Sequence, residues 1–142
     1  MQNLTNKGNF KEITVLIFLE KENALNEVRI LASINDPYII QYHEAFYDKE
    51  LSCLCVIMEF AGGGDILKLI EKHKKPSKKL ISERLIWRYF IQMVKGLKTL
   101  HNMKIYHRDL KCANVFISSD KKSIKLGDMN VSKVAKRELV KT

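Results

Sequence analysis

The chain has 142 residues, enough for one ordinary domain, and 46% of them are hydrophobic, which excludes disorder throughout. Its net charge of +9 permits binding to nucleic acid, acidic lipid or phosphorylated ligands, but charge does not predict a fold. The three cysteines, Cys53, Cys55 and Cys112, lack the C-x-x-C spacing of a zinc site and do not form a disulfide pattern. These features indicate a globular protein in a reducing, cytoplasmic environment.

The first apolar segment, residues 13–19, has the composition of a strand, but the sequence reveals no clear partner for it. The segment is far too short to span a bilayer and lacks the cleavage site of a secretory signal, so we expect no membrane association. Deleting residues 8–19 would join Lys7 to Glu20 in a smooth polar lead into the next segment. Our hypothesis is that residues 8–19 are an insertion, such as a retained short intron; the alternative is an extra strand.

A helix is predicted over residues 20–34, because Ala24, Val28 and Leu31 recur at helical spacing and Asn35-Asp36-Pro37 ends the pattern. Glu27 stands at the edge of this apolar stripe. An unpaired buried charge is strongly destabilising, so we expect Glu27 to have a cationic partner. If the helix stood alone, a simple salt bridge between Glu27 and a surface lysine would be the better interpretation.

Two strands are predicted next, over residues 38–47 and 51–60, and the turn at residues 48–50 makes them an antiparallel pair. The second strand ends in M-E-F-A and is followed by Gly62-Gly63-Gly64. This triple glycine lacks the G-x-G-x-x-G spacing of a phosphate-binding loop, so we interpret it as a flexible link.

Asp65 is a suitable N-cap for a short helix over residues 66–73, which runs into five lysines between Lys72 and Lys79. We interpret this charge run as a solvated loop. Nucleic-acid binding would need aromatic stacking residues or a reading helix beside the charge, and the run has neither. We therefore expect no nucleic acid among the partners.

The strongest periodic signal is a helix of about six turns that Ser82 can cap. Its apolar stripe is predicted to be core and consists of Ile86, Phe90, Met93, Leu97 and Leu100. Gly96 lies within the same helix, where a missing side chain allows another backbone to approach closely.

The most informative stretch follows this helix and reads H-R-D-L-K-C-A-N, residues 107–114. Asp109 and Asn114 place a proton acceptor beside a carbonyl oxygen that suits magnesium, and Lys111 adds a cation. The alternative is a surface loop in which Asp109 and Lys111 merely pair. A predicted hairpin, residues 115–117 and 124–126, leads to a second acidic site at Asp128, and this order of elements favours the catalytic interpretation.

These motifs resemble the NIMA-related serine/threonine protein kinases. The resemblance extends from Glu20 to about Lys141 and rests on N-E-V-R-I-L-A-S-I, M-E-F-A-G-G-G-D, I-W-R-Y-F-I-Q-M-V-K-G-L, H-R-D-L-K-C-A-N-V-F and L-G-D-M-N-V-S-K-V-A-K. It implies an α+β, protein-kinase-like two-lobed fold that is incomplete. Residues 1–60 would be the remnant of the small lobe, with its sheet and helix, and residues 61–142 the start of the mainly helical large lobe.

The resemblance also implies the functional residues. Asp109 would orient the substrate hydroxyl, Lys111 would steady the transferring phosphate, and Asn114 and Asp128 would hold Mg2+. The residues expected around ATP are Glu27, which pairs with a strand lysine, Met58 as gatekeeper, Glu59 and Ala61 through their backbone groups, and Phe116 under the adenine. Lysine at position 111 is the serine/threonine-kinase pattern, so the implied partners are ATP, Mg2+ and protein substrates with serine or threonine hydroxyls. The implied location is cytoplasmic, including association with the cytoskeleton.

Several expected kinase features are missing from the sequence. We expect that the glycine-rich loop, the strand lysine and the A-P-E motif lie outside the chain, so that these 142 residues fold poorly alone. Met129 and Asn130 replace the usual phenylalanine and glycine after Asp128, and both substitutions are compatible with activity. The alternative function is a non-catalytic kinase-like module that binds nucleotide or a partner protein.

Overall fold

The computed structural model describes residues 13–18, 23–50, 53–74 and 79–129, and for residues 13–18, 23–27 and 53 it describes the backbone alone. The described chain forms two compact units. The first contains residues up to Asn35 and Ile40–Phe60, and the second contains Asp36–Ile39 and Ala61–Met129. None of the helices in these described segments is long and apolar enough to cross a membrane.

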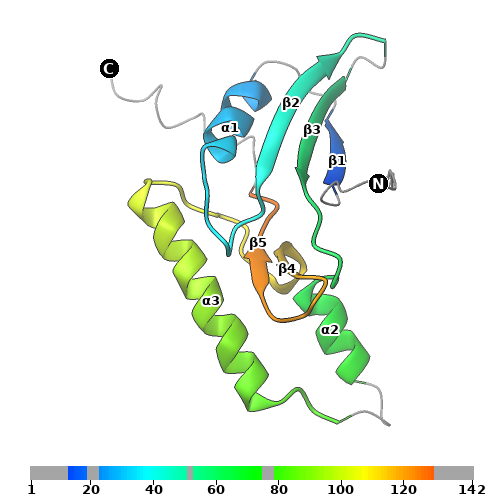
Figure 1. Ribbon diagram of the computed structural model, residues 1–142, viewed down its shortest axis with the longest axis vertical. Coiled ribbons are helices and arrows are strands. Elements are labelled where there is room, and N and C mark those ends of the chain that lie inside the picture. Colours follow the sequence, from blue (N-terminus) through cyan, green and yellow to red (C-terminus); the bar gives the residue numbers. More distant parts are fainter. Residues whose placement is uncertain (1–12, 19–22, 51–52, 75–78, 130–142) are drawn as a thin grey trace. The chain divides into compact units, whose positions relative to one another are not determined.

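The first unit is a three-stranded antiparallel sheet with one helix (Figure 1). Its strands are β1 (Ile13–Phe18), β2 (Tyr42–Asp48) and β3 (Cys53–Glu59), and β3 lies in the centre. The predicted antiparallel pairing of the last two strands is confirmed. The central position of β3 explains why Leu54, Val56 and Met58 are all buried in it.

The partner of β1 is β3, and the pairing runs without a break from Ile13 opposite Glu59 to Phe18 opposite Leu54. The sequence did not reveal this partner, because strand pairing depends on a segment about forty positions away. The structure therefore shows the strand that we weighed as the alternative to an insertion. The origin of residues 8–19 stays a prediction, which peptide mass spectrometry across Asn9–Glu20 tests.

The helix of the first unit is α1 (Asn23–Ala32), which lies against β2. Val28 and Leu31 are buried at helical spacing, as predicted, and Ile34 continues the core just beyond the helix. Glu27 belongs to α1, but its side chain lies outside the described residues. The predicted cationic partner of Glu27 therefore stays a prediction.

The second unit begins its main segment with the triple glycine, which is not the flexible link that we expected. Gly63 N donates to Ile117 O at 2.9 Å, and Ile117 N donates to Gly64 O at 2.7 Å. A Cβ on Gly63 would lie 2.4 Å from Ser118 O, which no side chain tolerates. The glycine is required for this close approach of two backbones, and Gly64, at φ 84°, makes the following turn.

The α2 helix (Ile66–His73) has the bounds predicted from the sequence, and Asp65 caps it by accepting a hydrogen bond from Lys68 N at 2.8 Å. The long helix α3 (Glu83–Asn102) is capped by Ser82, as predicted. A 3-10 turn, η1 (Cys112–Asn114), then leads into the hairpin of β4 (Val115–Ile117) and β5 (Ile124–Leu126). The predicted hairpin is thus confirmed.

The predicted core stripe of α3 is only partly buried. Leu100 is fully buried, but Ile86 and Phe90 are 53% and 48% exposed. The face of α3 that packs on β5 is instead centred on Tyr89, Gly96 and Leu100. Helical periodicity shows that one face of α3 is apolar, but it does not show which neighbour covers that face.

The segment Asp36–Ile39, which we call the clip, joins the second unit from far upstream. Leu126 N donates to Tyr38 O at 2.8 Å, and Ile39 forms a parallel bridge with Leu126. Thr99 Oγ1 donates to Asp36 Oδ2 at 2.5 Å. A Cβ on Gly96 would lie 3.0 Å from Tyr38 O, so the predicted close approach at Gly96 is confirmed.

Candidate active site

The loop between α3 and η1 presents a carboxylate, a lysine and an asparagine within one turn. Asp109 N donates to His107 O at 2.8 Å, and Asn114 N donates to Lys111 O at 2.9 Å, so two tight turns fold the loop back on itself. Arg108 adopts φ 61°, a left-handed conformation that a non-glycine residue adopts rarely. Such backbone strain is commonly found at functional sites.

Asp109 is the centre of the loop. Its Oδ2 accepts hydrogen bonds from Lys111 Nζ at 2.8 Å and from Asn114 Nδ2 at 3.0 Å. Asn114 Nδ2 also donates to the backbone oxygen of Asp109 at 2.8 Å. Within the described part of the chain, Oδ1 of Asp109 accepts no hydrogen bond. The carboxylate is therefore held by one oxygen and presents the other.

These contacts also fix the charge on the loop. The hydrogen bond from Lys111 lowers the pKa of Asp109, and the hydrogen bond from Asn114 lowers it further. The same contact with Asp109 raises the pKa of Lys111. Both side chains are partly exposed, at 33% for Asp109 and 55% for Lys111, and an exposed ion pair stabilises a fold only weakly. The pair is therefore better explained by positioning than by stability.

Asn114 is 4% exposed and uses its amide nitrogen for both bonds to Asp109. The amide oxygen then points away from Asp109, and none of the described residues donates a hydrogen bond to it. A buried amide held in one orientation, with its oxygen available, is suited to bind a cation. The predicted neighbourhood of Asp109, Lys111 and Asn114 is thus present in the structure.

Asp128 is brought to this loop through its neighbour Gly127. Gly127 N donates to Asn114 O at 3.0 Å, and Gly127 O lies 3.0 Å from Nε2 of the buried His107. The contact with Asp109 is the main cause of the raised pKa of Lys111, and the negative charge of Asp128 adds to it. Asp128 is exposed, and its φ of 50° turns the chain sharply at this point.

His107 is a structural residue in this arrangement. It is 3% exposed, and burial lowers the pKa of its imidazole, so the ring is neutral at physiological pH. A neutral ring can donate its Nε2 proton to Gly127 O, which anchors the segment before Asp128. Its burial and this contact give His107 a packing role rather than the role of a base.

The residue after Asp128 also has the predicted environment. Met129 is 1% exposed, as expected for a flexible side chain that fills a pocket usually occupied by phenylalanine. Asn130 lies outside the described residues. Cys112 is exposed on η1.

The expected nucleotide-binding residues divide between the two units. Glu27, Met58 and Glu59 belong to the first unit, where Met58 is buried in β3 and Glu59 N donates to Gln41 O at 2.8 Å. The amide of Glu59 is therefore engaged within the first unit. Ala61 and Phe116 belong to the second unit, with Phe116 half-buried in β4.

Two residues that sequence reasoning missed hold the hairpin on α3. Tyr89 donates its hydroxyl proton to Lys121 O at 2.9 Å, and burial is the main cause of the raised pKa of Tyr89. Gln92 donates to Lys122 O at 3.2 Å and accepts from Ile124 N at 2.9 Å. The only sequence signal was that both polar groups stand beside the apolar stripe of α3.

No cluster of three or more histidine, cysteine, aspartate or glutamate side chains that could hold a metal ion is present among the described residues. This excludes a zinc-type site in that part of the chain. Magnesium is different, because it is commonly held by one or two protein oxygens together with water and substrate phosphates. The carbonyl oxygen of Asn114 and the carboxylate of Asp128 fit that pattern.

Comparison with known proteins identifies the family of this chain. The sequence model of the protein kinase domain matches residues 8–142. The chain belongs to the protein kinase family. Among curated kinases it is 38% identical to a probable serine/threonine-protein kinase nek2 of Dictyostelium discoideum, and the alignment covers 92% of this chain. It is 33% identical to the serine/threonine-protein kinase Nek6 of rice (89% of this chain) and 36% identical to Nek1 of mouse (87%).

This chain spans 32%, 24% and 10% of the length of these three relatives, respectively. The resemblance to NIMA-related kinases predicted from the sequence is confirmed, and so is the mixed α and β kinase-like fold. The family match includes β1 and the residues just before it.

Proposed function

We propose that this chain forms part of the catalytic domain of a serine/threonine protein kinase, which transfers the γ-phosphoryl group of ATP to protein hydroxyls. The observation that carries the proposal is the geometry of Asp109, which is held through Oδ2 by Lys111 and Asn114 while none of the described residues donates to Oδ1. Phosphoryl transfer depends mainly on positioning and charge neutralisation, and this loop supplies both.

Each residue of the loop has a role in the proposal. Asp109 accepts a hydrogen bond from the substrate hydroxyl and orients it for attack. Lys111 holds Asp109 in place and offers a positive charge to the transferring group. Asn114 and Asp128 would hold Mg2+, which would neutralise the charge that develops on the phosphoryl group donated by ATP. The cytoplasm and the cytoskeleton are the proposed locations, by analogy with the family.

The proposal extends to the first unit. Glu27 on α1 would form the ion pair that orients the ATP phosphates, and Met58, Glu59, Ala61 and Phe116 would surround the adenine. We base these assignments on their positions in the family motifs, because the two units are described separately.

The lysine expected to pair with Glu27 requires a revised proposal. We expected it outside the chain, but β1 is the antiparallel neighbour of β3 and the family match begins at residue 8. Lys11 precedes β1 by two positions and Glu27 by sixteen. Lys11 itself lies outside the described residues, so the assignment rests on its place in the sequence. We propose Lys11 as the strand lysine, which also makes residues 8–19 an integral part of the kinase.

The test of the main proposal is phosphoryl transfer by the full-length protein from γ-labelled ATP to a peptide library with serine, threonine or tyrosine acceptors. We expect labelling of serine or threonine peptides, and Asp109→Asn should lower the rate by about 10²- to 10⁴-fold. Glu44→Gln is the matched control, because Glu44 is an exposed carboxylate on β2, and it should leave the rate unchanged. Nucleotide binding without transfer would favour the non-catalytic module instead.

The Lys11 assignment has its own test. Lys11→Met should lower the transfer rate by about 10²-fold or more, while Lys7→Met, which removes the same charge four positions earlier, should not. Equal rates for the two variants would reject Lys11 without affecting the role of Asp109.

The proposal also includes the exposed face of α3. Phe90, Ile86 and Trp87 are each about half exposed, although large apolar side chains on one helix face are normally buried. We propose that further helices of a complete kinase domain cover this face. The 142 residues alone should then lack a cooperative thermal transition, whereas the full-length protein should show one.

A further inference from the structure

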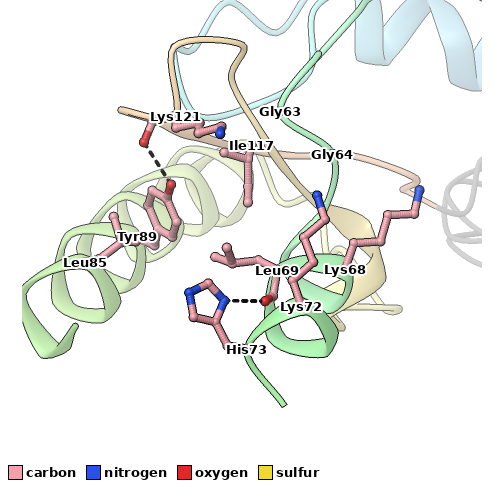
Figure 2. A pocket seen from close by; sticks show the side chains of 10 residues that line it. All are labelled: Gly63, Gly64, Lys68, Leu69, Lys72, His73, Leu85, Tyr89, Ile117 and Lys121. Atoms are coloured by element: carbon pink, nitrogen blue, oxygen red, sulfur yellow. Dashed lines mark hydrogen bonds between the residues drawn. The ribbon is translucent and has the colours of Figure 1, made fainter. Parts of the chain in front are cut away.

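A pocket of about 400 Å³ lies in the second unit, between α2, α3 and the β4–β5 hairpin (Figure 2). None of the residues of the catalytic loop lines it, so it is separate from the candidate active site. Nothing in the proposed phosphoryl transfer uses this pocket. Its chemistry therefore suggests a further function.

The floor of the pocket is apolar and firmly held. It is formed by Leu69 from α2, Leu85 and Tyr89 from α3, and Ile117 from β4. The hydroxyl of Tyr89 is bonded to Lys121 O, and Ile117 is bonded to Gly63 and Gly64 through its backbone. These bonds link α3 to the hairpin and the hairpin to the segment that leads into α2, so the pocket is largely preformed, as in most ligand sites.

The rim of the pocket is basic. Lys68 and Lys72 stand on α2, and Lys121 stands on the hairpin turn opposite (Figure 2). Lys68 is partly neutralised by Asp65 at 3.3 Å. Lys72 and Lys121 take part in none of the ion pairs found among the described residues, and the lysine-rich sequence after α2 contains no carboxylate up to Lys79. Within the described part of the chain, the rim thus has two lysines outside any ion pair and a third that Asp65 partly neutralises.

The apolar floor beneath two or three lysine ammonium groups limits which ligands the pocket can bind. Inorganic phosphate would match the rim but would leave the floor uncovered. A nucleic acid base would need an exposed aromatic face, but Tyr89 is only 5% exposed and its hydroxyl is already bonded. A peptide with apolar side chains between carboxylates matches both parts.

We propose that this pocket docks an acidic peptide segment of a partner protein, with apolar side chains on Leu69, Leu85 and Ile117 and carboxylates at Lys72 and Lys121. Docking at this pocket leaves the catalytic loop accessible. A partner held here could therefore present a hydroxyl to Asp109 from another part of its chain, and that consequence alone rests on the proposed function.

The binding test uses the full-length protein and a fluorescein-labelled peptide, E-E-L-E-L-E-E, followed by fluorescence anisotropy. We expect saturable binding that weakens as ionic strength rises, because the carboxylates and lysines are exposed to solvent. Replacing both leucines of the peptide by serine should weaken binding at least about tenfold, since the apolar contacts are lost. Anisotropy reports binding without catalysis, so failure of the kinase assay would not affect this result.

Charge reversal in the protein gives the matched comparison. Lys72→Glu should weaken binding at least about tenfold, because like charges then oppose each other, and Lys121→Gln should weaken it about two- to fivefold. Lys98→Glu makes the same charge change on an exposed part of α3 that does not line the pocket and should alter binding by less than about twofold. Thermal unfolding of each variant checks that the fold is retained.

Three results would overturn the proposal. They are no saturable binding to the wild-type protein, equal weakening by Lys72→Glu and Lys98→Glu, and equal binding of the leucine and serine peptides. The last result would mean that the rim attracts any anion and that the pocket itself is not used.

Discussion

The catalytic loop and the outer face of α3 differ in how completely their side chains find partners within the described chain. In the loop, Asp109, Lys111 and Asn114 bind one another, and Gly127 is bonded to both ends of the loop. On α3, Ile86 and Phe90 are about half exposed, and no described element covers them. Hydrogen bonds set by short-range turns can therefore be complete even where the apolar packing between distant segments is incomplete.

The largest expected effect concerns that apolar packing. In the full-length protein, Leu100→Ala should lower the free energy of unfolding by about 2–5 kcal/mol, because Leu100 is fully buried. If further helices cover α3, Phe90→Ala should cost about 3–5 kcal/mol as well. Denaturant unfolding of both variants gives the comparison. A cost below about 1 kcal/mol for Phe90→Ala would mean that this face is exposed in the complete protein.

A second prediction concerns the polar loop. Lys111→Met should lower the phosphoryl-transfer rate by about 10²-fold, because Asp109 loses one of its two side-chain donors and the transferring group loses a charge. Its stability should change little, since the ion pair is partly exposed. Kinetic assays and thermal unfolding of the same sample separate the two effects. A large loss of stability would show that the pair is structural.

A third prediction compares two glycines that hold the hairpin behind the loop. Gly63→Ala should destabilise the protein by about 1–3 kcal/mol, because the new Cβ would lie 2.4 Å from a backbone oxygen. Gly64→Ala has open space, so only its φ of 84° opposes the change, and the cost should be about 1 kcal/mol. Thermal unfolding ranks the two variants. The reverse order would mean that the Gly63 segment separates easily from β4.

The smallest expected effect is a pH dependence. Burial lowers the folded-state pKa of His107 below its ordinary value of 6.5, so the unfolded chain binds more protons in this range. Stability should therefore fall as the pH drops below about 6.5 and continue to fall until the folded-state pKa is reached. His107→Gln should remove this contribution to the slope of unfolding free energy against pH. An unchanged slope would mean that another group causes it.

Features encoded within a few residues were predictable from the sequence. The bounds of α2 follow from the Asp65 cap, and the β4–β5 hairpin follows from its turn residues. The contact of Asp109 with Asn114 follows in the same way, because both stand in one short loop.

Features that depend on distant partners could not be predicted. The pairing of β1 with β3, the approach of Gly63 to Ser118 and the bond from His107 to Gly127 each join segments that are separate in the sequence. A glycine or a histidine in the sequence indicates a particular packing or hydrogen-bonding requirement at its position, but it does not identify the backbone segment that will lie there. The same limit explains why periodicity on α3 predicted an apolar face without predicting what covers it.

The clip at Asp36–Ile39 has a consequence for how the protein folds during synthesis. It is made early, but its partners Thr99 and Leu126 leave the ribosome only after most of the second unit has been synthesised. Contacts of such long sequence separation slow folding, because a long loop must close before they form. The clip therefore stays without its partner in β5 until that strand emerges, and its unpaired backbone is open to wrong pairing during that interval.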